Sequence, residues 1–232
     1  MTTVVPPSSP PSRPTFDFVR PFTFVFDDPR WIPKILMGGL FTLASVFIVG
    51  AFFVYGYLAR LVRNVIAGVP NPLPEWDELG EFFGEGAKLF CVALVYAIPI
   101  VLLIMLMVIP AAILSNNDDS DLSRNLGGGI VTCMWCLVFP ISLAMAVWLP
   151  GALLMAIVTG QFSAAFDYRR IAAFIRANVG NYLLAFVVWL VARFGAGFGF
   201  LLLCVGIFFT LFWAFCVAAY AFAQTYRLST VK

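Results

Sequence analysis

The side chains best suited to chemistry form an acidic run between residues 75 and 85. Its members are Glu75, Asp77, Glu78, Glu81 and Glu85. Carboxylate oxygens at this density are suited to binding a divalent cation. At spacings of three and four residues they are also typical of a solvated helix face, which is the interpretation we prefer. Catalysis by this run at the membrane surface is the least favoured use.

Two of the five cysteines, Cys133 and Cys136, form a C-x-x-C spacing around Trp135. A redox or metal role would require a second pair or a nearby base, and neither is visible. The chain contains no histidine, which removes the commonest general base and metal ligand. We therefore predict packing roles for the thiols, no enzymatic activity, no cofactor and no metal.

Composition indicates a membrane protein, since 62% of the residues are hydrophobic and only 11% are charged. A net charge of +2 gives no reason to expect nucleic acid as a partner. The predicted spans contain no carboxylate, which disfavours an ion-coupled transporter. We predict an all-α, polytopic transmembrane helix bundle in which membrane lipids are the main partners.

Four apolar blocks supply the spans, and each crossing needs about 20 residues. The blocks are residues 35–58, 88–114, 128–158 and 180–224. The last is long enough for two helices and breaks at the glycine-rich stretch 193–199, which gives about five segments. Prolines in the second and third blocks predict kinks whose freed carbonyls neighbouring helices must satisfy. Arg193, the one charge inside a block, snorkels from a helix end in our preferred interpretation; the alternative is a functional charge within the membrane.

Two topologies remain open for the first block. As a plain crossing, it divides Lys and Arg six against eight, which carries no signal. As a re-entrant hairpin bending near Gly50, it divides them twelve against two, as the positive-inside rule favours. We take five spans as the simplest count, because the first block contains no proline that would bend it into a hairpin. Both topologies place the C-terminus and the interface helices in the cytoplasm and the loop 116–125 outside.

The polar segments organise the remainder of the chain. Residues 1–15 form a Pro/Ser-rich tail that is extended or disordered, and 228–232 form a C-terminal tail. Residues 16–34 form an aromatic interfacial segment whose phenylalanines alternate, which favours an extended strip. Within a single transmembrane domain, 35–227, two amphipathic interface helices are expected at about 73–88 and 164–177. One is acidic and the other basic, so we expect them to pair.

Several short motifs resemble one family. The stretch 56–65, the run 71–76 (Asn-Pro-Leu-Pro-Glu-Trp) and the run 86–88 are similar to the bacterial and archaeal membrane family named domain of unknown function 4013. Residues 150–152, 165–167, 175–178, Tyr182 and 224–227 resemble its later landmarks. The resemblance covers about Phe26 to Arg227 and departs at Val179, where the family has proline. It implies a multi-spanning membrane protein and no assigned activity.

These observations favour a non-enzymatic accessory, scaffold or assembly subunit of a membrane complex. The alternative is a carrier or binding protein for a lipid or small apolar molecule. The candidate interaction residues are the polar and aromatic side chains of the interface segments, together with Arg193: Arg60, Arg63, Asn64, Pro72, Pro74, Glu75, Trp76, Asp77, Lys88, Phe166, Asp167, Arg169, Arg170, Arg176 and Asn178.

Overall fold

The computed structural model describes residues 15–117, 121–201 and 205–230, and all regular structure in these ranges is helical. The α-helices (α) and 3-10 helices (η) are, in chain order, α1 (Arg20–Thr23), η1 (Phe24–Asp27), α2 (Trp31–Ala44), η2 (Ser45–Phe47), α3 (Val49–Ala67), α4 (Leu79–Asn117), α5 (Asp121–Thr159), η3 (Phe162–Phe166), α6 (Tyr168–Ala177), α7 (Val179–Gly197), η4 (Phe198–Leu201) and α8 (Gly206–Thr230). The predicted all-α class is confirmed. The N-terminal tail lies outside the described residues except for Thr15, and α8 continues to Thr230 where a C-terminal tail was predicted from 228.

Five helices are long and apolar enough to cross a membrane: Val49–Ala67, Leu79–Ile113, Val131–Thr159, Val179–Leu201 and Gly206–Thr230. Their number agrees with the prediction, and the break expected in the last block separates α7 from α8. Helices α4 and α5 each run through two internal prolines without interruption. Near Pro150, the Tyr182 hydroxyl of α7 donates to the Val147 oxygen of α5 over 2.6 Å; the carbonyl that Pro150 itself frees is that of Ala146, four residues before it.

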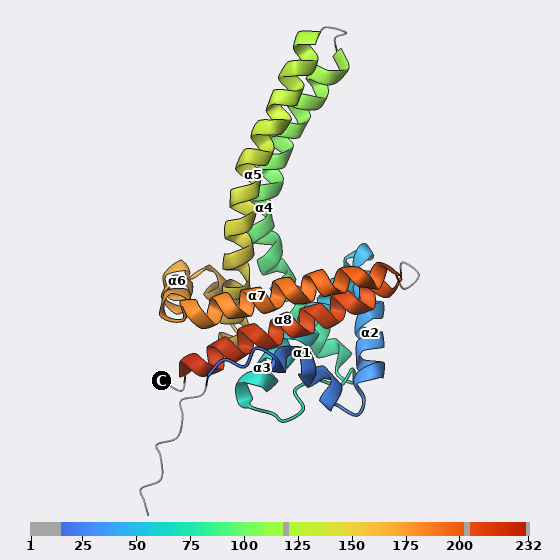
Figure 1. Ribbon diagram of the computed structural model, residues 1–232, viewed down its shortest axis with the longest axis vertical. Helices are drawn as coiled ribbons and strands as arrows, with labels where there is room; N and C mark the ends of the chain where they lie inside the picture. Colours follow the sequence, from blue (N-terminus) through green and yellow to red (C-terminus); the bar gives the residue numbers. More distant parts are fainter. Residues whose placement is uncertain (1–14, 118–120, 202–204, 231–232) are drawn as a thin grey trace, which may run out of the picture.

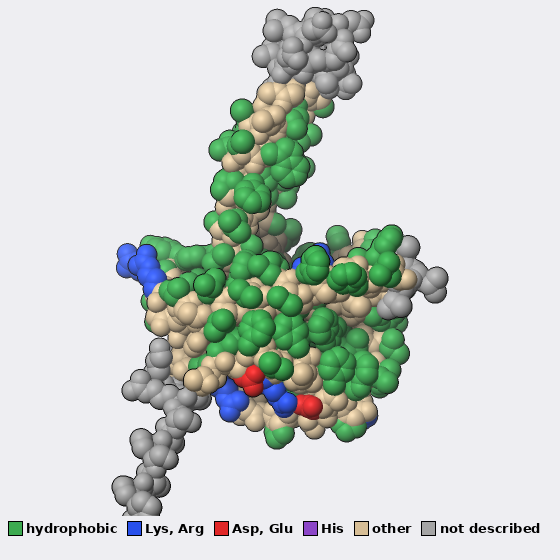
Figure 2. Space-filling model, viewed as in Figure 1, with side chains coloured by type: hydrophobic (Ala, Val, Ile, Leu, Met, Phe, Trp, Pro, Cys, Tyr) green, Lys and Arg blue, Asp and Glu red, His purple; other side chains and the backbone are tan. Residues whose placement is uncertain are grey.

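Helices α4 and α5 form a long antiparallel hairpin that projects beyond the other helices (Figure 1). We call its projecting part, residues 93–113 and 131–145, the arm. Helices α7 and α8 form a second hairpin that crosses the base of the arm, and α6 contacts α5 near that base (Figure 1). Hydrophobic side chains are distributed along the visible face of the arm (Figure 2).

Residues 35–58 do not form the single crossing that we took as the simplest count. Helix α2 ends at Ala44, the 3-10 turn η2 follows, and Ile48 adopts φ 67°, a rare value for a β-branched residue. The chain then returns as α3 in contact with α2, so the structure has the hairpin of the alternative topology. Gly50 allows the two helices to approach closely, because a Cβ there would overlap the Phe41 carbonyl oxygen.

Both ends of the α2–α3 hairpin lie on one face of the protein. Lys34 at the start of α2 donates a hydrogen bond of 3.0 Å to the Leu73 carbonyl, beyond the end of α3. The end of α8 reaches the same face, since a Cβ on Gly68 would lie 3.0 Å from Arg227 Nη2. The N-terminal segment therefore shares a face with the end of α3 and the end of α8, which a single crossing by residues 35–58 would not permit.

Two predictions for the membrane interface are wrong in detail. The aromatic segment 16–34 is not an extended strip, because it contains α1 and η1 and buries Phe24 and Val25. The first predicted interface helix is the beginning of α4. It starts at Leu79 instead of residue 73 and is continuous with the rest of that helix. Residues 69–78 are irregular, consistent with the tendency of residues before proline to avoid helical conformation. The second interface helix agrees with the prediction, since η3 and α6 together cover Phe162–Ala177.

The core between α3, α4 and α8 is aromatic and tightly packed. Tyr57 and Phe212 are fully buried, and their ring centroids are 5.3 Å apart. The backbones of α3 and α4 approach at Gly56 and Gly86, because a Cβ on either would overlap a carbonyl oxygen of the other helix. By contrast, nothing lies within 4 Å of a Cβ built on Gly80 or Gly84, also in α4.

Candidate functional site

The loop between α3 and α4, residues 68–78, is irregular yet partly buried, with Pro72, Leu73 and Pro74 inside the protein. Side chains of α3 satisfy its carbonyl groups. The Tyr57 hydroxyl donates to the Pro74 oxygen over 3.1 Å, and the Asn64 amide donates to the Pro72 oxygen over 2.9 Å. Buried backbone groups require such partners, so these two bonds position the loop against α3.

A buried ion pair joins the same loop to the start of α2. Lys34 Nζ lies 2.6 Å from Asp28 Oδ2 and 2.8 Å from Glu75 Oε1, and the Lys34 and Asp28 side chains are only 5% and 6% exposed. Burial alone would raise the pKa of Asp28, but hydrogen bonds from the Lys34 side chain and the Arg30 backbone outweigh it and lower that pKa. Asp28 is therefore ionised at neutral pH and forms a charged pair with Lys34.

Trp76 packs the α3–α4 loop against α2 and α3. Its ring stacks on Tyr57 at a centroid distance of 4.3 Å and lies 4.9 Å from Phe41. Its indole Nε1 donates to the Lys34 carbonyl over 3.0 Å. The next residue, Asp77, is exposed and forms no ion pair with the described residues. Trp76 thus belongs to the folded framework, whereas Asp77 faces outward.

Two arginines of α3 bind the acidic face at the start of α4. Arg60 pairs with Glu78 and, at 3.1 Å, with Glu81. Arg63 donates hydrogen bonds to both carboxylate oxygens of Glu85, one of them at 2.8 Å. Its Nε donates to the Ile157 carbonyl at the end of α5 over 3.3 Å. Bidentate arginine–carboxylate pairs fix geometry as well as charge. The acidic carboxylates are therefore used to join α3, α4 and α5.

The expected pairing between the acidic and the basic interface helix is not observed. In the described ranges, no carboxylate pairs with Arg169, Arg170 or Arg176, which are exposed on α6. These three cations lie at the end of the bundle that carries most of the charges, as expected for contacts with anionic headgroups.

Residues of the second half fix α6 at the base of the arm. Asp167 caps α6 by accepting a hydrogen bond of 3.1 Å from the Arg170 amide, and Phe166 stacks on Tyr96 at 5.5 Å. The Tyr96 hydroxyl donates to the Ala165 carbonyl over 2.6 Å. Asn178, which is buried, donates from its amide to the Phe174 carbonyl over 2.9 Å.

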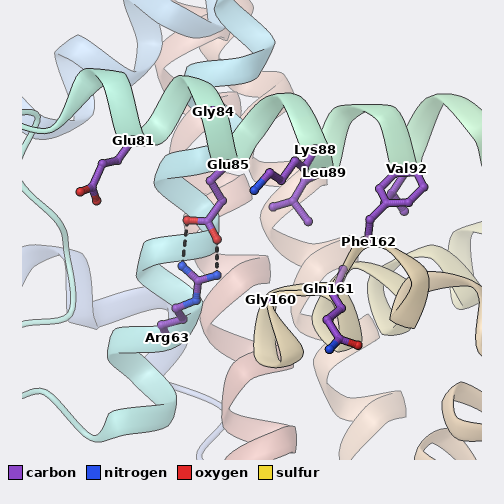
Figure 3. A pocket seen from close by; sticks show the side chains of 11 residues that line it. Arg63, Glu81, Gly84, Glu85, Lys88, Leu89, Val92, Gly160, Gln161 and Phe162 are labelled. Carbon is purple, nitrogen blue, oxygen red and sulfur yellow. Dashed lines mark hydrogen bonds and ion pairs between the residues drawn. The ribbon is translucent and has the colours of Figure 1, made fainter.

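A polar pocket of about 370 Å³ opens where α3, α4 and the end of α5 meet. Its charged and polar lining comes from Arg63, Glu81, Glu85, Lys88 and Gln161, with Phe162 at one side (Figure 3). In Figure 3, Glu81, Glu85 and Lys88 project from one side of α4, and the Arg63–Glu85 pair forms one wall. Lys88 forms no ion pair with any described residue, so it is the uncompensated cation of this pocket.

An apolar pocket of about 320 Å³ lies beside the polar one. It is lined by α3, α4, α5, α7 and α8, with the largest side chains at Tyr55, Trp189, Phe215 and Phe222. Leu89 lines both pockets. The adjoining pair of pockets was not visible in the sequence, because its residues are distributed over five helices.

The structure brings half of the predicted interaction residues together around the α3–α4 loop. Arg60, Arg63, Asn64, Pro72, Pro74, Glu75, Trp76 and Lys88 all belong to this region. Arg193 does not belong to this region. It is exposed in the last turns of α7, near the C-terminal end of that helix. The sequence interpretation missed Asp28, Lys34 and Tyr57. The available signal was a lysine, Lys34, directly beside the first apolar block.

Divalent-cation binding by the acidic run receives no geometric support. Among the described residues, no three His, Cys, Asp or Glu side chains form a group that could hold a metal ion. Glu78, Glu81 and Glu85 are paired with arginines, and Glu75 is paired with Lys34 and Arg30. The solvated face preferred from the sequence is thus a face engaged in ion pairs.

Comparison with the curated proteins and with the solved structures finds no match. A family model, described as protein of unknown function (DUF4013), matches residues 40–205. The matched region begins in α2 and extends just beyond η4, so it includes the α3–α4 loop, the polar pocket and the arm, whereas the α8 side chains that line the apolar pocket lie beyond it. The chain is a multi-pass membrane protein that belongs to the DUF4013 family.

Proposed function

We propose that this protein is a non-enzymatic accessory or assembly subunit of a membrane complex, and that the arm binds transmembrane helices of another protein. The observation that carries the proposal is how little of α4 the chain itself covers. Only 6% of the most apolar stretch of α4 is buried inside the protein, whereas the buried share of the corresponding stretch is 50% in α8 and 44% in α3. Large side chains of the arm are bare, with Leu106 72% exposed and Phe139 67% exposed.

The length of the arm supports a protein partner over lipid alone. The apolar stretch 89–113 of α4 is about 37 Å long at 1.5 Å per residue, which exceeds a hydrocarbon core of about 30 Å. Such a helix must tilt, and packing against neighbouring helices sets the tilt. Above its base the arm has no neighbour among the described residues except the other helix of the hairpin. Helices of a partner would supply the missing contacts.

The chemistry of the polar residues supports a role without catalysis. The buried charges Asp28 and Lys34 are paired, and the carboxylates facing the polar pocket are held by arginines. No histidine is present in the chain to act as a general base. These groups account for the attachment of the α3–α4 loop and leave no free acid–base pair near the pockets.

Photocrosslinking in native membranes tests the partner. With benzoylphenylalanine at Leu106, we expect a discrete protein adduct, because the arm would lie against partner helices. The matched control is the same probe at Val191, which is 50% exposed on α7. Adducts of lipid alone at both positions would refute the proposal. A crosslinked band at twice the mass of the chain would show that the partner is a second copy of this protein instead of another protein.

The proposed orientation places the charged face in the cytoplasm. Ten Lys and Arg residues of the described ranges belong to this end: Arg20, Arg30, Lys34, Arg60, Arg63, Lys88, Arg169, Arg170, Arg176 and Arg227. Only Arg124 and Arg193 lie toward the other end, and the positive-inside rule favours the ten-residue side as cytoplasmic. The apolar part of α3, residues 49–59, is about 16 Å long, so the α2–α3 hairpin is proposed to be re-entrant.

Cysteine labelling tests this orientation. In a cysteine-free background, a membrane-impermeant maleimide is expected to label Phe198→Cys in intact cells and Thr23→Cys only after permeabilisation. Ser229→Cys is the matched control, because it lies at the end of α8 and should behave like Thr23→Cys. Labelling of Thr23→Cys from outside would restore the single crossing by residues 35–58.

The alternative function, binding of a lipid or small apolar molecule, is favoured by one specific observation. The apolar pocket is built from five helices and has a volume within the usual range for small-molecule sites.

A further inference from the structure

The polar and apolar pockets adjoin each other and share the lining residue Leu89. On α3, Val62 lines the apolar pocket and the next residue, Arg63, lines the polar one. On α5, Ile157 and Ala156 are divided in the same way, and Leu89 of α4 lines both. The two pockets therefore lie side by side on three helices, at one level of the structure.

The apolar pocket extends from this level into the membrane by the depth of one leaflet. It runs along α3 from Val62 back to Val54, about 12 Å, and along α5 from Ile157 back to Ala146, about 16 Å. Half of a hydrocarbon core of about 30 Å is about 15 Å. The polar pocket lies beside the apolar one, among the charges of α3 and α4 that we assign to the headgroup layer.

Lys88 gives the polar pocket one place for an anionic group. Arg63 is paired with Glu85, and Arg60 is shared between Glu78 and Glu81, so Lys88 is the lining cation that forms no ion pair with any described residue. Gln161 lies on the facing loop, across the pocket from α4, with its amide directed away from that helix (Figure 3). The Lys88 ammonium group suits the oxygens of a phosphate ester.

We propose that this site binds one phospholipid, with its phosphate at Lys88 in the polar pocket and an acyl chain in the apolar pocket. The site is separate from the arm and does not depend on a protein partner. It differs from ordinary contact with bulk lipid because both pockets are formed by the folded chain and Leu89 lines both of them. Binding should therefore be saturable at one lipid per chain.

Native mass spectrometry of the purified full-length protein in a nonionic detergent tests the assignment. The probes are dioleoyl phosphatidylglycerol, dioleoylglycerol with the same chains and no phosphate, and glycerol phosphate with no chains. We expect one tightly bound phosphatidylglycerol, at least about tenfold weaker binding of dioleoylglycerol, and no competition by glycerol phosphate. Equal binding of the two lipids, displacement by glycerol phosphate or unsaturable binding would each overturn the assignment.

Two variants separate the halves of the site. Lys88→Gln is expected to weaken phosphatidylglycerol about tenfold without changing dioleoylglycerol, whereas Ala219→Phe is expected to abolish both by filling the apolar pocket. Leu149→Trp replaces Ala219→Phe if that variant is not monodisperse. Arg193→Gln, a cation outside both pockets, is the control and should bind normally. Full binding by Lys88→Gln would exclude the phosphate contact, whatever the outcome of crosslinking at the arm.

Discussion

Lys34→Met is expected to lower the free energy of unfolding by about 3–5 kcal/mol at pH 7. The substitution keeps most of the side-chain volume but leaves Asp28 ionised, 6% exposed and without its cation. Removing one partner of a buried pair costs this much because the remaining charge is desolvated without compensation. It also releases the Leu73 carbonyl, which Lys34 binds at 3.0 Å. Thermal or denaturant unfolding in detergent micelles measures the loss.

The effect of pH on this loss follows from the sign of the pKa shift. In the native protein the pKa of Asp28 is lowered, so its contribution is present above the unfolded value of about 3.9 and is lost as pH falls through the folded value. In Lys34→Met the same carboxyl is buried without a cation and gains from protonation. The stability difference between the two proteins should therefore narrow as pH falls from 7 toward 4.

Arg30→Met is the matched control for the lysine variant. Arg30 pairs at 2.8 Å with Glu75, the second carboxylate partner of Lys34, but the Arg30 side chain is 69% exposed. An exposed pair contributes at most about 1 kcal/mol. Equal losses for Lys34→Met and Arg30→Met would show that burial of the Asp28–Lys34 pair is not what stabilises the loop.

Gly86→Ala is expected to be the second most damaging of the proposed variants, with a loss of about 3 kcal/mol. A Cβ at this position would overlap the carbonyl oxygen of Phe52 and lie 2.7 Å from the amide nitrogen of Gly56. Both atoms belong to the backbone of α3, so no side-chain rotation relieves the contact. The helices must separate, and overpacking of this kind typically costs 1–3 kcal/mol or more.

Gly84→Ala, two residues earlier in α4, provides the control. Nothing lies within 4 Å of a Cβ at Gly84, and alanine is favoured over glycine in a helix by about 1 kcal/mol. The control should therefore be neutral or slightly stabilising in the same unfolding measurement. If Gly86→Ala is as stable as Gly84→Ala, the close crossing of α3 and α4 does not exist.

Composition and apolar run length were sufficient to predict the fold class, the number of candidate spans and the break between α7 and α8. The interface helix at 164–177 was also predictable, since it is amphipathic and its cap, Asp167, is local in sequence. The turn between α2 and α3 was harder, because it contains no proline and its strained residue is isoleucine. Gly50 two residues later was the only local indication.

The candidate site was only partly predictable because its key contacts join residues far apart in the chain. Pro72 and Pro74 suggested a helix start, yet their carbonyls are instead bound by Tyr57 and Asn64. The partners of Lys34 lie on both sides of it in the sequence, at Asp28 and at Glu75. The role of each residue became definable only once α2 and α3 were seen to return to the same face.

The α2–α3 hairpin bears on how the protein is inserted during synthesis. A hairpin that enters and leaves on one side carries no polar loop through the bilayer, and its exposed tip, Val46 to Val49, is entirely apolar. In the proposed orientation, only the connections after α4 and after α7 must be translocated. Both are short and contain few basic residues, which is the kind of loop that crosses a membrane most readily. The N-terminal segment can therefore remain in the compartment where it is made.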